Sequence, residues 1–288
     1  SFSKSSITLN FLLLNVILGT LVSAISYYHT KHQDISLHYF HELLFIFTIF
    51  ISLLIQKILL QRSWKENIIT TLIAISWIFI VLGLSSLNYS NSYDSYAYHF
   101  DSINCFSQYI HPTSDNCVAD IQAKHFPNLI FSINSFFSHL TGDIQSANYF
   151  SMAAFSLLLV PCFYISNLKK INIWTRLILI ISIISNPIII VQLWSTNNDG
   201  SSTCLYILTC YSFLRLYSEE RKFKSLHTSI ILLCLILLLG SKFSTGVVIM
   251  LSIPLMLLSY YYLTKTSINE LFQLFDVSKY PVLIMLPL

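Results

Sequence analysis

Long apolar runs alternate with short polar stretches along most of the chain. Eight runs are nearly free of charged residues and a ninth opens near the end: 7–28, 41–61, 67–87, 149–168, 171–194, 203–217, 228–240, 246–263 and 280–288. Most approach the roughly 20 residues that an α-helix needs to cross the hydrocarbon core of a bilayer. The pattern predicts an all-α polytopic membrane protein with eight to nine transmembrane helices.

The runs divide the chain into three parts. Three transmembrane helices are expected in residues 1–87, a polar segment in 88–148, and the remaining transmembrane helices in 149–288. The runs at 203–217 and 228–240 are short, which favours buried, tilted or interrupted helices that line a cavity. The sequence opens on Ser1 and stops at Leu288 inside an apolar run, so we expect further protein beyond the C-terminus.

The polar segment contains its own apolar periodicity. Apolar residues recur there at three-and-four spacing, at Leu129, Ile130, Ile133, Phe136, Phe137 and Leu140, with polar residues between them. This spacing predicts an amphipathic helix on the membrane surface, and a shorter one is expected around Ile103 and Phe106. Two interpretations stay open. The helices could cover a cavity at the membrane boundary, or the segment could be a loop that only packs its apolar side down.

Composition and charge agree with a membrane protein and add an orientation. The chain is 55% hydrophobic and 10% charged, whereas soluble domains average roughly 25% charged residues. With a cytoplasmic N-terminus, 13 of the 16 basic residues fall on the cytoplasmic side, and the other side receives Lys31, Lys124 and Lys242. The positive-inside rule favours this orientation. We therefore expect a bacterial inner-membrane protein with the 88–148 segment in the periplasm or a lumen.

The six cysteines divide into two groups. Cys105 and Cys117 lie in the outer segment, where an oxidising compartment would join them in a disulfide; two unpaired thiols are the alternative. The others fall in apolar runs without metal-ligand spacing and are expected to be small buried residues: Cys162, Cys204, Cys210 and Cys234.

Three polar clusters fall on the outer side. The first, "YDSYAYH", contains Asp94, Tyr98 and His99, which a helical conformation would bring together on adjoining faces. The second is "STNNDG" at 195–200, and the third is "GSKFSTG" at 240–246. Each also has a structural explanation, namely a helix cap, a turn or a snorkelling lysine. Two carboxylates and one ammonium on one side nevertheless indicate a site, because a carboxylate can act as general base and a lysine can hold a phosphate.

The same clusters carry a resemblance to a known superfamily. "YDSYAYHF" resembles the D-x-x-x-Y-H-[hydrophobic]-P signature in the first outer loop of bacterial GT-C glycosyltransferases, which include protein mannosyltransferase-like and aminoarabinose transferase-like enzymes. "STNND" resembles their later T-x-N-D turn, and "GSKFSTG" resembles a turn with small residues and a lysine. The order and spacing agree over about residues 90–250, although Asp101 stands where the family has proline.

The resemblance implies a function and a set of site residues. The enzyme would move a sugar from a polyprenyl-phosphate donor to an acceptor on the periplasmic side. Asp94 would be the catalytic base or a ligand of Mg²⁺ or Mn²⁺, and Asp199 a second acidic site residue. Substrate binding would fall to Tyr98, His99, Asn198 and Lys242, the last of these on the donor phosphate.

Two other functions stay open. A noncatalytic accessory subunit of a larger membrane assembly could be built on a GT-C-like scaffold, with other membrane subunits and lipids as its partners. A secondary transporter is the second alternative, but the apolar runs hold few ionisable residues and the halves show no inverted repeat. His32, Asp34 and His38 could bind a metal, although a polar interfacial loop explains them better. No nucleic-acid or nucleotide motif is present, so no such partner is expected.

Overall fold

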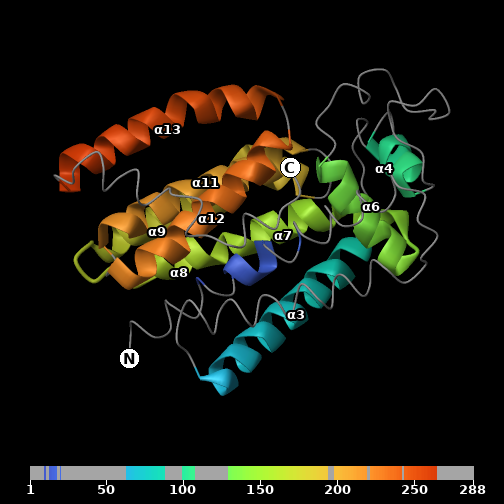
Figure 1. The fold of residues 1–288 in the computed structure, drawn as a ribbon, viewed down its shortest axis with the longest axis horizontal. Coiled ribbons are helices and arrows are strands. Elements are labelled where there is room, and N and C mark those ends of the chain that lie inside the picture. Colours follow the sequence, from blue (N-terminus) through green and yellow to red (C-terminus); the bar gives the residue numbers. More distant parts are fainter. Residues whose placement is uncertain are drawn as a thin grey trace.

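The structure is a computed structural model of the 288-residue chain. It describes residues 10, 13–17, 20, 63–87, 99–107, 129–193, 198–218, 221–241 and 243–264. Within these ranges the chain forms helices and short turns and contains no β-strand. The prediction of an all-α protein is confirmed at this level (Figure 1).

The helices follow one another with short connections over most of the described chain. In order they are α3 (Trp64–Ser86), α4 (Phe100–Ser107), α6 (Leu129–Thr141), the 3₁₀ helix η2 (Ile144–Asn148), α7 (Tyr149–Leu157), α8 (Leu159–Ser166), α9 (Ile173–Ile184), α10 (Pro187–Gln192), α11 (Asn198–Ser218), α12 (Arg221–Leu239) and α13 (Phe243–Thr264).

Three helical stretches are long and apolar enough to cross a membrane, as expected of a membrane protein. They are Trp64–Ser86, Ile144–Ser166 and Ile173–Gln192, while Leu226–Leu239 and Gly246–Ser259 are shorter apolar stretches. The described residues therefore do not support the predicted eight to nine spans. One reason is that α11, expected to span, contains several hydroxyl residues and the charged Asp199 and Arg215. Other predicted runs, 41–61 and 280–288, lie outside the described residues.

Side-chain caps and prolines set the helix ends. Ser63 caps α3 by accepting a hydrogen bond from the Glu66 amide at 3.3 Å, a serine and glutamate spacing typical of helix starts. Asn186 caps α10 in the same way, and Pro187 occupies the first turn, where its missing N–H costs nothing. Pro161 cannot donate to the carbonyl four residues earlier, and α7 accordingly ends at Leu157.

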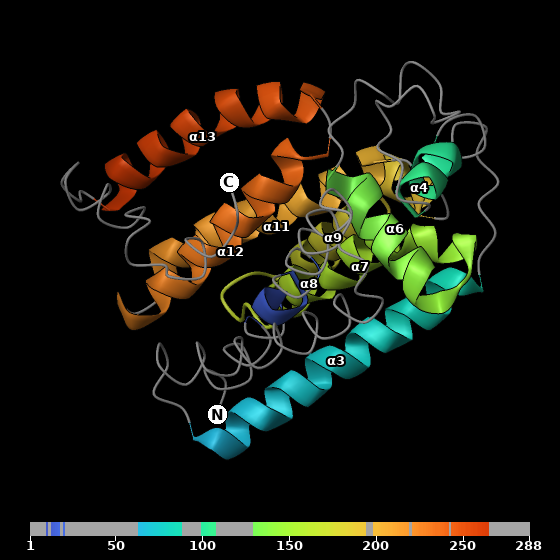
Figure 2. The same ribbon diagram turned by 45° about the vertical axis from the view of Figure 1, so that its right-hand side comes forward.

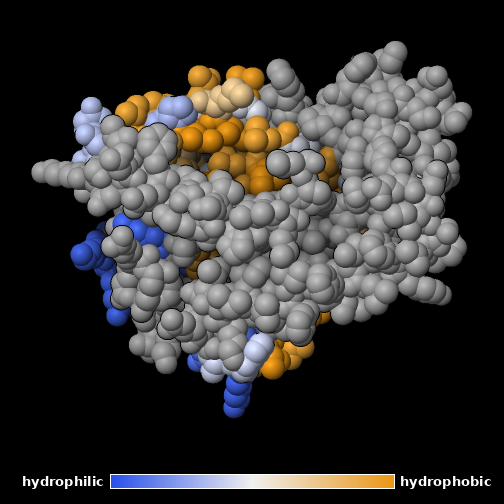
Figure 3. All heavy atoms as spheres, in the orientation of Figure 1, coloured by the Kyte–Doolittle hydropathy of each residue, from blue (hydrophilic) through white to orange (hydrophobic). Residues whose placement is uncertain are grey.

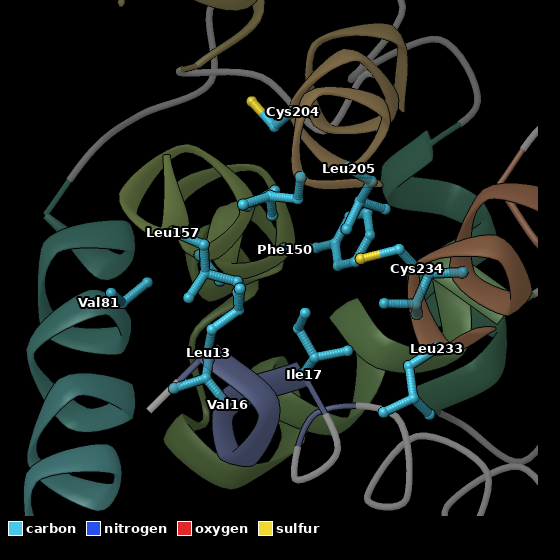
Figure 4. Close-up of a cluster of buried hydrophobic side chains, with 14 of the residues drawn as sticks. Leu13, Val16, Ile17, Val81, Phe150, Leu157, Cys204, Leu205, Leu233 and Cys234 are labelled. Atoms are coloured by element: carbon cyan, nitrogen blue, oxygen red, sulfur yellow. The ribbon is translucent and has the colours of Figure 1, made fainter. Parts of the chain in front are cut away.

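The helices pack as a bundle with an additional pair of helices at one end. α11 packs against α12, α7 and α10, while α3 lies against α7 and η2. α13 runs along one edge of the bundle and α3 along the opposite edge (Figures 1 and 2). α4 and α6 pack against each other at the end where α3 finishes. The core lies between α3, α7, α11 and α12 (Figure 4).

That core collects apolar side chains from segments far apart in the sequence. Figure 4 shows residues of the N-terminal helical segment, α3, α7, α11 and α12 directed toward one another: Leu13, Val16, Ile17, Val81, Phe150, Leu157, Leu205 and Leu233. Each of these side chains is buried. Burial of a Leu or Ile side chain contributes roughly 1.5–3 kcal/mol in water, but in a bilayer close packing rather than water exclusion holds such helices together.

Helix α6 differs from the surface helix that the sequence predicts. The helix is present over the expected residues, but residues 130–138 are all buried, including its serines and Asn134. Ser135 Oγ donates to the Ile103 carbonyl of α4 at 2.8 Å, and the Phe137 ring stacks on Tyr149 of α7 at 3.6 Å. The polar face of α6 is therefore turned toward protein neighbours, because α4, η2 and α7 surround it.

Candidate functional site

The structure describes part of the predicted site. His99 and Asp199 are described in full, and Asn198 is described as the first residue of α11 without its side chain. Asp94, Tyr98 and Lys242 lie outside the described residues. The structure therefore shows the part of the protein immediately beside each of the three polar clusters.

The cysteines are described in the same partial way. Cys105 is disulfide-bonded, whereas its predicted partner Cys117 lies outside the described residues, so the pairing itself stays a prediction. The four cysteines of the apolar runs are free thiols inside helices, three of them buried and Cys210 half-buried.

His99, the last residue of the first cluster, is anchored on α6. Its side chain is buried, and its ring centroid lies 5.4 Å from that of Phe131, with the two rings inclined at 57°. Phe131 also packs with Phe100, Ile103 and Ala147 in a small apolar cluster that joins α4, α6 and η2. The first cluster therefore ends in contact with helix α6.

Asp199, in the second cluster, is held by a glutamine from the preceding helix. Gln192 Nε2 donates to Asp199 Oδ2 at 3.4 Å, and Gln192 Oε1 accepts from the Gly200 amide at 2.6 Å. A Cβ atom on Gly200 would lie 3.0 Å from Gln192 Cβ and 3.3 Å from the Ile188 carbonyl oxygen. The glycine therefore lets α10 approach the start of α11, and the amide then orients the carboxylate.

Gln192 is a site residue that the sequence analysis missed. It lies inside the apolar run 171–194 and was counted as part of a transmembrane helix. Its position in the sequence could have indicated the contact, because an amide side chain stands there a few residues before a turn that carries an aspartate.

The third cluster contacts α11, two residues beyond the second cluster, and also α6. Ser241 Oγ lies 2.9 Å from Ser202 Oγ of α11, and both side chains are buried. A Cβ atom on the neighbouring Gly240 would lie 2.7 Å from Leu129 Cβ and still closer to its Cδ2. The end of α12 therefore touches the first turn of α11 and the first residue of α6.

These contacts form one continuous path between the three clusters. The path runs from His99 to Phe131, along the first turn of α6 to Leu129, then to Gly240 and Ser241, and across to Ser202, one turn after Asp199. α6, α11 and α13 all begin near this path. The starts of α6 and α11 contribute partial positive charge at this end of the bundle, and the C-terminal end of α12 contributes partial negative charge.

The structure describes only one of the two carboxylates proposed to bind the divalent cation. In the part of the chain that the structure describes, no group of three or more His, Cys, Asp or Glu side chains could hold a metal ion. Asp199 supplies one carboxylate, and the other proposed ligand, Asp94, lies outside the described residues. Cation binding stays a prediction.

A second polar cluster, also missed from sequence, lies toward the other end of α11. Tyr211 Oη donates to Asn10 Oδ1 at 2.8 Å, and Asn10 Nδ2 lies 3.5 Å from His227 Nε2. The guanidinium carbon of Arg215 lies 4.3 Å from the centre of the Tyr164 ring. Asn10, Arg215 and His227 are all buried. This cluster joins the N-terminal segment, α8, α11 and α12.

Comparison of the chain with protein-family models, with curated proteins and with solved structures finds no match. The resemblance to GT-C enzymes therefore rests on the three motifs and their order along the chain.

Proposed function

We propose that this protein is a membrane glycosyltransferase that moves a sugar from a polyprenyl-phosphate donor to an acceptor hydroxyl on the non-cytoplasmic face. The observation that carries the proposal is the contact path from His99 to Ser202, because it joins the flanks of all three motifs at one end of an apolar helix bundle. Three weak motifs at unrelated places would have argued against one shared site.

The proposed reaction assigns a role to each predicted residue. The acceptor oxygen attacks the anomeric carbon of the sugar, its proton passes to the Asp94 carboxylate, and the bond from that carbon to the phosphate oxygen breaks. The polyprenyl phosphate leaves with its charge beside Lys242 and the nearby helix starts. Asp199, oriented by Gln192, faces the sugar, while Tyr98, His99 and Asn198 shape the pocket. A Mg²⁺ or Mn²⁺ ion, if the enzyme uses one, would be held by Asp94 and Asp199 and would neutralise the phosphate.

Replacement of Asp94 tests the base. Loss of a positioned general base costs roughly 10²- to 10⁴-fold in rate, so Asp94→Asn should bind a polyprenyl-phosphate sugar but barely transfer it. The matched control is Asp101→Asn, since Asp101 lies seven residues away and is exposed in the first turn of α4. The measurement is sugar transfer by purified full-length variants. An unchanged rate for Asp94→Asn in an active preparation would exclude this site.

Replacement of Lys242 tests the phosphate contact. Lys242→Ala should weaken donor binding, because a phosphate near the membrane loses its countercharge. Lys224→Ala, which removes the same charge near the start of α12, should leave donor binding unchanged. Equal donor affinity in the two variants would remove Lys242 from the site, and absence of transfer with any lipid-linked sugar would favour the accessory-subunit interpretation.

The transporter alternative gains support from one observation. Arg215 and His227 are buried within the helix bundle, and ionisable groups in such positions commonly line transport pathways. Uptake assays in proteoliposomes with an imposed proton gradient distinguish the two functions: solute accumulation that depends on His227, together with unaltered uptake in Asp94→Asn, would favour transport.

A further inference from the structure

The turn between α8 and α9 carries two exposed cations at the end of a helical hairpin. It joins two of the candidate membrane spans, Ile144–Ser166 and Ile173–Gln192. Lys169 and Lys170 are both exposed in this turn, and Asn172 caps α9 by accepting from the Trp174 amide at 3.0 Å. Figure 3, in the orientation of Figure 1, shows hydrophilic atoms at the left-hand end of the molecule, where Figure 1 draws this turn.

The hairpin contains no acid that could neutralise these lysines. The sequence has no Asp or Glu between Asp143 and Asp199, a stretch that includes both spans. A third cation, Arg176, is fixed at the same turn because one of its Nη1 hydrogens bonds the Ser166 carbonyl at 2.5 Å. Its Nε is buried without a hydrogen-bond partner. Three positive charges therefore meet at this turn without a countercharge from their own hairpin.

The helix below the lysines is apolar on its exposed sides. None of the α9 residues is buried, and the exposed fractions of Trp174, Ile178 and Ile181 are 70%, 63% and 58%. A tryptophan at the end of a span is typical of the membrane interface. Cations thus stand at the headgroup level, directly beside an apolar surface that runs into the hydrocarbon.

We propose that the α8–α9 turn is a binding site for anionic phospholipid, with the headgroup phosphate on Lys169, Lys170 and Arg176 and the acyl chains along α9. An anionic lipid matches both halves of the surface, because its charge complements the turn and its chains complement the exposed apolar side of α9. The proposal does not depend on glycosyl transfer. Bound acyl chains would also cover the side of α9 that its own hairpin leaves exposed.

Lipid binding by the purified full-length chain tests this site. The protein is mixed with phosphatidylglycerol and phosphatidylcholine in detergent, and bound lipid is counted by native mass spectrometry. Each basic residue near a membrane surface contributes about fivefold to binding of anionic lipid. Lys169→Gln and Lys170→Gln should each lower the preference for phosphatidylglycerol about fivefold, and the double variant about 25-fold.

The control is Lys65→Gln, which removes one exposed cation from the first turn of α3. Lys65 is followed directly by Glu66, so its charge has an acid beside it. We expect an unchanged lipid preference for this variant. Equal preference in the double variant and the wild type would overturn the proposal. An equal loss with Lys65→Gln would overturn it as well, because net charge alone would then explain the effect.

Discussion

Gly240, the residue that follows α12, lies close against helix α6. A Cβ atom at this position would overlap the side chain of Leu129, including its Cβ, which cannot rotate away. Gly83, inside α3, offers the opposite case, because nothing lies within 4 Å of the Cβ it would carry. The two glycines separate the effect of crowding from the effect of backbone freedom.

We expect Gly240→Ala to lower the free energy of unfolding by about 1–3 kcal/mol, the usual range for overpacking a tight contact. Gly83→Ala should be neutral or stabilising by about 0.5–1 kcal/mol, since alanine favours the helix interior. Thermal unfolding in detergent measures both variants. Adding Leu129→Ala to Gly240→Ala should recover part of the loss; a Gly240→Ala protein as stable as the wild type would show that the two helices can separate without cost.

At the scale of elements, α11 and α12 form the central antiparallel pair beside the candidate site. Ser202 and Ser241 join them through a buried hydrogen bond at the end nearest the three motifs. A double-mutant cycle with Ser202→Ala and Ser241→Ala should give a coupling free energy of about 0.5–1.5 kcal/mol. Ser182→Ala is the control, because that exposed hydroxyl bonds only within α9. Additive effects of the two serine changes would mean that the contact contributes nothing.

The sequence predicted elements well where one local pattern decides them. The three-and-four spacing from Leu129 to Leu140 marks α6 almost to the residue, and continuous apolar runs mark three spans. It did not predict that the polar face of α6 is buried, because that depends on α4 and η2. The roles of Gln192 and Gly240 were equally hidden, since each depends on a contact with another helix. Motif order predicts that the three motifs meet at one end of the bundle, and this stays a prediction because Asp94, Tyr98 and Lys242 lie outside the described residues.

For the whole molecule, the proposed orientation puts the three motifs and the α8–α9 turn on opposite faces of the membrane. The free cysteines at 162, 204, 210 and 234 are largely hidden in helices, so new cysteines can report accessibility. In intact cells, Asn91→Cys and Asn198→Cys should react with a membrane-impermeant maleimide, and Lys170→Cys should react only after the inner face is opened. The reverse pattern would invert the topology and remove the site from the outer face.

The contact between Gly240 and Leu129 also imposes an order in time. The two residues are separated by about a hundred positions in the sequence, which a ribosome translates in roughly 5–20 s at typical bacterial and eukaryotic rates. During that interval α6 has already been made, while the end of α12 that meets it does not yet exist. The side of α6 that contacts Gly240 is therefore uncovered until the end of α12 has been synthesised, and the flanks of the three motifs come together only after that.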